Sequence, residues 1–398
     1  MNAPLDGLRL LDLSTVVAGP FGTQVLGHFG MDVIRVSAPP AETSWPSHPP
    51  GATVREAEGF TWALSRDKRS ICLDLKKPEG RAVFLDLVRH SDIVYDNFRP
   101  GVMQRLGLQY EVLAATNPRI VACSISGFGS EGPWAEVGAY DVAVQALGGS
   151  MSITGTGDPE SIPCRWGVPV GDIAGSLYAA IGLMAALEER ETTGRGQAVE
   201  VALLDAQLAL NTYRVPQAFG AGIEFTTPSP RRGGAGAVPY GPFRCGDGNW
   251  LVIAVATNFW AAFRTALDLP DDPRFATLSL RQQNQAELDA LLEHRFRARD
   301  AAGWEATLIA AGVPAGRVHD IPGAFAQGQA MARDMLLRFE SEGGREICVA
   351  GNPIRFAGED IPRSRPPVPN GFDTDAVLRE LGYDTAHIAV LRASGAAA

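Results

Sequence analysis

Residues 7–36 read GLRLLDLSTVVAGPFGTQVLGHFGMDVIRV, and this stretch decides the fold. The apolar run over residues 8–13 predicts a strand followed by a loop. Pro20 fits the first turn of a helix, whose apolar residues recur at helical spacing until Gly30 ends it. Residues 33–36 predict the next strand. Strand, helix and strand in this order form a βαβ unit, which implies a parallel sheet.

A second βαβ unit follows the first. Residues 70–75 predict a strand, a helix begins at Pro78, and residues 93–95 and 120–125 predict two further strands. Repeated alternation of strand and helix favours an α/β fold with a doubly wound, Rossmann-like sheet. In such sheets ligands bind beyond the carboxyl ends of the strands, so functional residues are expected in the loops that follow them.

A change in composition divides the chain. Residues 229–242 are dense in proline and glycine, which is typical of a linker or a domain boundary. We expect a large Rossmann-like domain over residues 1–210, completed by residues 330–398, and a smaller α/β domain over residues 225–325, with linkers between them. The elements predicted in the smaller domain are a strand over residues 250–256 and helices over residues 259–267 and 285–297.

The composition is that of an ordinary globular protein and argues against some classes of partner. The 398 residues carry a formal net charge of −10, which disfavours binding to nucleic acid. The five cysteines show no CxxC pair, so no disulfide framework is indicated and a reducing, cytoplasmic compartment fits best. No signal peptide is visible, and the apolar helix over residues 177–187 is shorter than a membrane span requires.

Motifs for common cofactors and metals do not occur in the sequence. The chain has no GxxxxGK[ST] phosphate loop, and the loop after the first strand is not GxGxxG. It has no HExxH, and its six histidines show no ligand spacing. We therefore expect no metal and no permanently bound cofactor.

One aspartate stands where a carboxylate can do chemistry. Asp172 lies in GVPVGDIAGS, residues 167–176, before an apolar helix expected to begin at Ile173. It can serve as an N-cap that accepts hydrogen bonds from first-turn amides. It can also serve as a nucleophile, because a helix N-terminus keeps a carboxylate ionised and its amides can stabilise charge that develops on a substrate. The two roles are compatible.

The segment DNFRPG, residues 96–101, directly follows a predicted strand and so reaches the edge of the sheet where ligands bind. Asn97 and Arg99 can meet polar or phosphate groups, and Phe98 can stack on a base. A simple β-turn accounts for the same residues equally well.

Longer stretches of the sequence resemble a known family. They are residues 7–36, KRSICLDLKKPEGR at 68–81, DNFRPGVMQRLGL at 96–108, NPRIVACSISGFGSEGPW at 117–134, YDVAVQALGGSMSITG at 140–155 and the stretch GVPVGDIAGSLYAAIGLMAALEERETTGRGQAVEVALLDAQ at 167–207. Through them the chain resembles the class III CoA-transferases, the family of formyl-CoA transferase and L-carnitine CoA-transferase. The stretches cover most of residues 4–207, and the match is looser after residue 210.

The resemblance implies an assembly and a chemistry. It implies a homodimer of two interlocked, ring-shaped subunits. It implies an enzyme that moves CoA from an acyl-CoA to a free carboxylic acid through an aspartyl mixed anhydride and an aspartyl-CoA thioester. The family's catalytic aspartate falls on Asp172, and the glycine before its first helix falls on Gly19. Its CoA-contacting positions fall on Val16, Leu73, Lys76, Asn97, Phe98, Arg105 and Tyr140, and the neighbouring Arg99 is a further candidate.

Two departures from the family pattern are visible. Family members often carry Glu followed by Arg or Pro after the second strand, where this chain has Ser37-Ala38, so a contact to the adenine or phosphates is lost or moved. The glycine-rich loop that covers the catalytic carboxylate in formyl-CoA transferase has no clear counterpart, and the candidate is residues 233–236.

Two other functions fit parts of the pattern. A 2-methylacyl-CoA racemase of the same superfamily needs an acid–base pair beside the α-carbon. The resemblance implies that racemases carry a histidine before the aspartate, where this chain has Tyr140, and a glutamate where it has Thr257. A non-catalytic CoA-binding protein is the second alternative, and Asp172 within its motif argues against it.

The acid is expected to be a short dicarboxylate, with succinyl-CoA as a candidate donor. This expectation rests on the pair Arg231-Arg232 at the domain boundary, together with Arg165 shortly before Asp172. A buried second carboxylate needs such a cationic partner, and the planar fork of arginine suits it. Arg231 and Arg232 can also be solvated linker charges.

Overall fold

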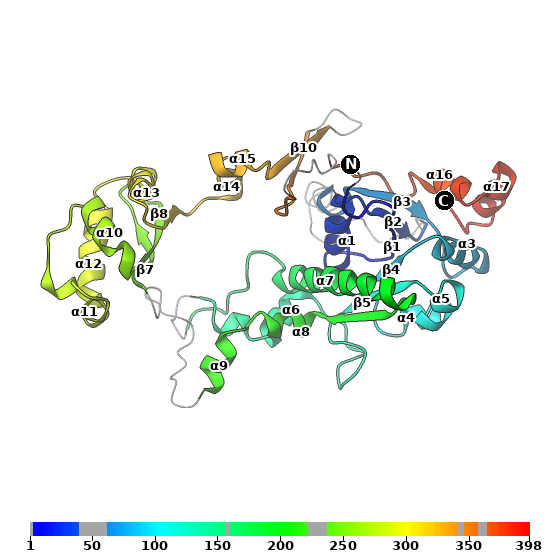
Figure 1. Cartoon of the computed structure of the whole chain (residues 1–398), viewed down its shortest axis with the longest axis horizontal. Coiled ribbons are helices and arrows are strands. Elements are labelled where there is room, and N and C mark those ends of the chain that lie inside the picture. The colour runs from blue at the N-terminus through cyan, green and yellow to red at the C-terminus, as the bar shows by residue number, and fades with distance from the viewer. Residues whose placement is uncertain (1–2, 40–61, 156–159, 221–236, 341–345, 357–363) are drawn as a thin grey trace. The chain divides into compact units, whose positions relative to one another are not determined.

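The chain forms two compact units, described here from a computed structural model (Figure 1). The structure describes residues 3–39, 62–155, 160–220, 237–340, 346–356 and 364–398. Unit 1 comprises Met1–Met151, Cys164–Ile223 and Asp334–Ala398, and unit 2 comprises Ser152–Pro163 and Glu224–Arg333.

Unit 1 is built on a parallel sheet, as the βαβ pattern predicted. Its described strands are β1 (Arg9–Asp12), β2 (Asp32–Ser37), β3 (Lys68–Cys72), β4 (Ile93–Asp96), β5 (Val121–Ser126) and β6 (Ala198–Ala202). They lie in the order β3-β2-β1-β4-β5-β6, so the order reverses between β1 and β4. A crevice forms beyond the strands at such a reversal, which is where ligands bind in doubly wound sheets.

Helices pack on both faces of this sheet. The helices of unit 1 are α1 (Ala18–His28), α3 (Pro78–Arg89), α4 (Val102–Arg105), α5 (Tyr110–Thr116), α6 (Asp141–Leu147), α7 (Val170–Thr193), α8 (Leu203–Ala209), α9 (Arg214–Phe219), α16 (Thr374–Glu380) and α17 (Thr385–Ala393), and a short helical turn spans Ser150–Ser152. Helices α1 and α7 lie side by side, and α7 also packs on α8 and α6 (Figure 1). The C-terminal segment of unit 1 adds the hairpin β10 (Leu336–Glu340) and β11 (Glu346–Ala350).

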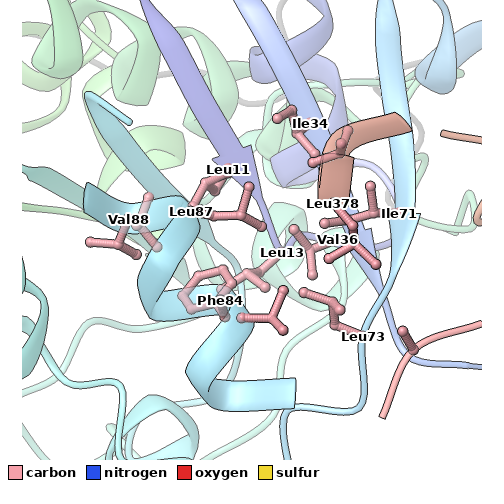
Figure 2. Packing of buried hydrophobic residues seen from close by; sticks show 14 of the residues in the cluster. Leu11, Leu13, Ile34, Val36, Ile71, Leu73, Phe84, Leu87, Val88 and Leu378 are labelled. Atoms are coloured by element: carbon pink, nitrogen blue, oxygen red, sulfur yellow. The ribbon is translucent and has the colours of Figure 1, made fainter. Parts of the chain in front are cut away.

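The strands divide their side chains between two hydrophobic cores. In β1, Leu10 faces the core under α1 and α7, whereas Leu11 faces the core under α3, α16 and α17. This alternation follows from the two-residue period of a strand. Figure 2 shows the second core, in which the labelled side chains are Leu11, Leu13, Ile34, Val36, Ile71, Leu73, Phe84, Leu87, Val88 and Leu378.

Helix α7 is longer than the sequence indicated. It runs for 24 residues and ends at Gly194, whose left-handed backbone (φ 72°) suits glycine. By length and composition it could cross a membrane, which corrects the expectation of a helix too short to do so. However, 61% of its most apolar window is buried within the fold, as in a core helix of a soluble protein.

Unit 2 is a smaller α/β unit with an antiparallel sheet in the order β7-β8-β9. Aromatic side chains such as Phe243, Phe263 and Trp304 fill its core. Its elements are β7 (Ala237–Arg244), β8 (Trp250–Ala256), α10 (Trp260–Ala266), α11 (Leu278–Gln283), α12 (Gln285–Phe296), α13 (Ala301–Ala310), β9 (Ala315–Arg317), α14 (Ile321–Phe325) and α15 (Gly328–Ala332), with short turns at Thr257–Phe259 and Pro273–Phe275.

Candidate active site

Asp172 lies inside the first turn of α7 rather than at its N-cap. The helix begins at Val170, three residues before the predicted start, and Pro169 occupies the N-cap position. Pro169 offers no side-chain oxygen, and the structure shows no side-chain cap hydrogen bond there. The N-cap interpretation of Asp172 is therefore wrong. Its half-buried carboxylate makes no hydrogen bond with another described residue.

A different aspartate caps this helix. Asp141, the first residue of α6, accepts hydrogen bonds through Oδ1 from the backbone N–H of Gly171 at 2.8 Å and of Asp172 at 3.2 Å. Its Oδ2 accepts a hydrogen bond from Gln145 Nε2 at 2.6 Å. The first-turn amides that were expected to stabilise charge on a substrate are thus already occupied by a protein carboxylate.

The electrostatic consequence is a basic carboxylate at Asp172. Burial, followed by the neighbouring negative charge of Asp141, raises the pKa of Asp172 to about 7. The expectation that the helix N-terminus keeps this side chain ionised is therefore wrong. The amides that would stabilise an ionised Asp172 donate their hydrogen bonds to Asp141 instead. Near neutral pH both protonation states of Asp172 are populated.

A pocket of about 270 Å³ opens beside Asp172, at the reversal of strand order. It is lined by the loops after β1 and β4, the end of β5, the segment that leads into α6, and the first turns of α7 and α8. The site residues predicted from the sequence that line this pocket are Val16, Asn97, Phe98, Arg99, Tyr140 and Asp172. Residues from four separate segments of the chain therefore meet where a doubly wound sheet binds its ligands.

The loop after β1 is held in a strained conformation. Val16 has a φ of 66°, which is rare for a β-branched residue, and its side chain is 54% exposed. Asn97 holds the preceding residue through two hydrogen bonds, accepting from Thr15 N at 2.9 Å and donating to Thr15 O at 2.7 Å. Strain of this kind is often retained where a ligand binds.

A buried ion pair beneath this loop was not foreseen from the sequence. Lys68 Nζ of β3 donates to Asp12 Oδ2 of β1 and to Pro20 O of α1, each at 2.9 Å. Burial alone would raise the pKa of Asp12, but Lys68 and the hydroxyls of Ser14 and Thr23 lower it. The signal available in the sequence was a charged residue inside an otherwise apolar strand.

Gly19 is required by close packing in the same loop. A Cβ at this position would lie 2.1 Å from Ser14 Cβ, so only glycine fits. Ser14 in turn donates its backbone N–H to Asp12 Oδ1 at 2.9 Å. The glycine singled out before the first helix therefore lets the loop fold tightly against the start of α1.

Three predicted contact residues do not line the pocket. Leu73 is 1% exposed and packs in the core, while Lys76 and Arg105 are exposed. Arg165 is also exposed and donates to Trp166 O at 3.3 Å without lining the pocket. Arg231, Arg232 and the glycines of residues 233–236 lie outside the described residues.

The described residues show no cluster of three or more His, Cys, Asp or Glu that could hold a metal ion. All five cysteines are among the described residues, and none of them forms a disulfide. The charged and polar side chains that line the pocket include the carboxylates of Asp141 and Asp172, the guanidinium of Arg99, the amide of Asn97 and the phenol of Tyr140.

Several known proteins are similar to this chain in sequence or in fold. The profile of CoA-transferase family III matches residues 5–374. An acetyl-CoA:oxalate CoA-transferase from Acetobacter aceti is 35% identical, with 95% of this chain and 96% of that protein covered. A succinyl-CoA:glutarate CoA-transferase from Mus musculus is 33% identical, with 98% and 90% covered. Among solved structures, a CAIB/BAIF family protein from Brucella suis is 34% identical, with a TM-score of 0.82 and 96% and 100% covered.

Proposed function

Because this chain belongs to CoA-transferase family III and is an enzyme of that class, we propose that it moves CoA from an acyl-CoA to a free dicarboxylic acid, with Asp172 as the covalent nucleophile. One observation carries the assignment of the nucleophile. The Asp172 carboxylate borders the switch-point pocket and makes no hydrogen bond with another described residue. A free, basic carboxylate beside a ligand pocket is suited to nucleophilic catalysis.

The proposed reaction proceeds through two covalent states. A carboxylate oxygen of Asp172 attacks the carbonyl carbon of the donor thioester, the C–S bond breaks, and CoA leaves as a thiolate. The aspartyl–acyl mixed anhydride that remains is attacked by this thiolate at the aspartyl carbonyl, which yields an aspartyl-CoA thioester and the donor carboxylate. The acceptor carboxylate repeats the two steps in reverse and restores Asp172. Both intermediates hydrolyse readily, so the pocket must exclude water.

The loops at the pocket supply groups for the CoA thioester. Asn97, the strained Val16 and Tyr140, which is 78% exposed, all line the pocket and are proposed to contact the thioester. Leu73, Lys76 and Arg105 remain proposed contacts for the outer part of CoA. Lys76 and Arg105 are exposed cations that suit its phosphates. In this proposal CoA is a substrate that binds to and dissociates from the pocket, not a permanently bound cofactor.

The acid is proposed to carry two carboxylates. Two relatives named above act on oxalate and on glutarate, which are both dicarboxylates. In this chain, Arg99 is the one cationic residue among the described residues that line the pocket. We therefore propose Arg99 rather than Arg165 as the partner of the second carboxylate, and the Arg231-Arg232 pair stays an untested alternative outside the described residues. We also propose a cytoplasmic enzyme, because free thiols suit a reducing compartment.

Replacement of the nucleophile tests the proposed function. Asp172→Ala should lower CoA transfer from succinyl-CoA to glutarate by roughly a thousandfold or more, as for other covalent nucleophiles, while CoA still binds. Hydroxylamine added with the donor should convert Asp172 of the wild type to a hydroxamate, detected by peptide mass spectrometry. Asp205→Ala, which removes an exposed aspartate from α8, is the matched control. Transfer by Asp172→Ala at the wild-type rate would contradict the mechanism.

A further inference from the structure

We propose that Asp141 is a positioning residue that holds Asp172 at the start of α7 and makes its carboxylate a stronger nucleophile, an inference that rests on the proposed function. Two roles are combined in one side chain. Asp141 fixes the backbone that carries Asp172, and its negative charge acts on the Asp172 carboxylate. Both roles follow from contacts between α6 and the first turn of α7.

The hydrogen bonds of Asp141 tie three segments together. Its Oδ1 accepts from the amides of Gly171 and Asp172, and its Oδ2 accepts from Gln145. Gln145 is fully buried, and its Oε1 accepts the backbone N–H of Trp166 at 2.9 Å. Helix α6, the chain entering α7 and the first turn of α7 therefore share one hydrogen-bonded network. A buried network in which each polar group has a partner restricts the geometry of its members.

Close packing leaves the Asp141 carboxylate little freedom. A Cβ at Gly171 would lie 3.0 Å from Asp141 Oδ1 and 3.3 Å from a methyl group of Val144. Glycine at position 171 therefore lets the carboxylate approach the helix end. The same helix N-terminus in another protein would offer its amides to a substrate anion, whereas here an aspartate occupies them in the resting enzyme.

The charge of Asp141 distinguishes the states of the catalytic cycle. Ionised Asp172 and Asp141 repel each other, whereas the mixed anhydride and the thioester of Asp172 are neutral. Repulsion is therefore present in the resting nucleophile and relieved when the covalent bond forms. A carboxylate destabilised in this way is more basic, and nucleophilicity rises with basicity.

Other charged groups near the start of α7 do not explain this effect. Besides burial, Asp141 is the group that raises the pKa of Asp172. The remaining titratable groups on the elements packed against α7, and among the residues that line the pocket, are His28 of α1, Cys123 of β5, Tyr140 at the N-cap of α6, Glu200 of β6, Asp205 of α8 and Arg99 of the loop after β4.

Asp141→Asn separates the charge from the cap. Its side-chain oxygen can still accept both amides of α7, but the negative charge and the hydrogen bond from Gln145 Nε2 are lost. In the wild type, kcat/KM for the donor should decrease as the pH drops below about 7, the pKa of Asp172, because attack requires the ionised carboxylate. In Asp141→Asn this limb should move to lower pH by roughly one unit, the effect expected of removing one nearby like charge. The rate on the alkaline plateau should fall by roughly threefold, because a nucleophile that is one pKa unit less basic attacks more slowly by only part of that factor of ten.

Asp384→Asn is the matched control, because Asp384 caps α17 by accepting the backbone N–H of His387 at 2.9 Å and lies on an exposed helix end. It should leave the pH profile unchanged. If Asp141→Asn is too slow to profile, the infrared carbonyl band of protonated Asp172, assigned by its loss in Asp172→Asn, reports the same shift directly.

The outcomes separate this inference from the proposed function. A lower acid limb or infrared titration in Asp141→Asn supports the inference. An unmoved titration of Asp172 in a folded Asp141→Asn protein overturns it, while hydroxamate formation at Asp172 still upholds the proposed function. A wild-type enzyme that forms no hydroxamate at Asp172 and transfers no CoA contradicts the proposed function itself.

Discussion

Arg99 is the residue on which selection among acids should depend. Its guanidinium lies against Gly138, where an added Cβ would come within 2.5 Å of Arg99 Nη2, and it forms no ion pair with another described residue. A second carboxylate in the pocket would find its cation here. We expect Arg99→Gln to lower kcat/KM for succinate or glutarate by tenfold or more, about 1.4 kcal/mol, and to leave kcat/KM for butyrate nearly unchanged.

The measurement is a specificity series with succinate, mesaconate, itaconate, malate, butyrate and phenylpropionate as acceptors. Arg165→Gln, which removes an exposed arginine outside the pocket, is the control. If Arg99 binds a phosphate of CoA instead, Arg99→Gln should raise KM for the acyl-CoA and should lower kcat/KM for all acceptor acids to a similar extent. Equal specificity constants for butyrate and succinate in the wild type would exclude a second-carboxylate site.

Single residues were predicted from the sequence where their role is local. Asp172 was singled out within its motif, and its side chain lines the pocket from the first turn of α7. Its raised pKa was not predicted, because it arises from burial and then from the charge of Asp141, which is distant in sequence and approaches only when α6 packs on α7. The placement of Val16 beside Asn97 likewise depends on the loops of two different strands.

At the scale of elements, the order of the strands in the sheet determines where the pocket lies. The apolar patterns predicted β1 to β5, β8 and the first helix to within a few residues, since α1 begins at Ala18 and contains Pro20, but β6, β7, β9, β10 and β11 were not predicted. The early start of α7 was missed because Pro169 and Val170 carry no strong helix-start signal. The pairing of β1 with both β2 and β4 follows only from the folded sheet, and it places the pocket loops together.

The ion pair between Asp12 and Lys68 joins β1, β3 and α1, so its removal should weaken unit 1. Lys68→Met leaves the fully buried Asp12 without its counter-ion, and the free energy of unfolding should fall by roughly 3–5 kcal/mol. Lys76→Met, which removes an exposed lysine, should change the free energy of unfolding by about 0.5 kcal/mol or less.

Urea unfolding followed by circular dichroism measures both variants. The double variant Asp12→Asn/Lys68→Met should recover part of the lost stability, because the buried charge is then gone. Equal unfolding free energies for Lys68→Met and Lys76→Met would show that the pair does not stabilise the fold.

At the scale of the whole molecule, the helices beside the active site expose apolar side chains. Monomeric proteins rarely leave such side chains gathered on neighbouring helices, so a covering partner is expected. The exposed residues are Val142 and Leu147 on α6, Leu177, Tyr178 and Ile181 on α7, and Leu208 on α8. These helices pack on one another within unit 1. We propose a second copy of the chain as the partner, in agreement with the interlocked homodimer that the family resemblance implies.

The homodimer should persist on dilution and exchange subunits slowly, because interlocked rings cannot separate without opening the chain. Light scattering should give twice the chain mass of 42.3 kDa at micromolar concentration, and mixed dimers of differently tagged chains should not form within hours. Ile181→Asp should shift the mass toward the monomer or lower the urea concentration of dissociation, because an ionised carboxylate would be buried at the interface. Val390→Asp on α17 is the matched control, since Val390 and Ile181 are each 65% exposed, and it should stay dimeric. A monomeric wild type, or rapid exchange of tagged subunits under native conditions, would contradict the interlocked assembly.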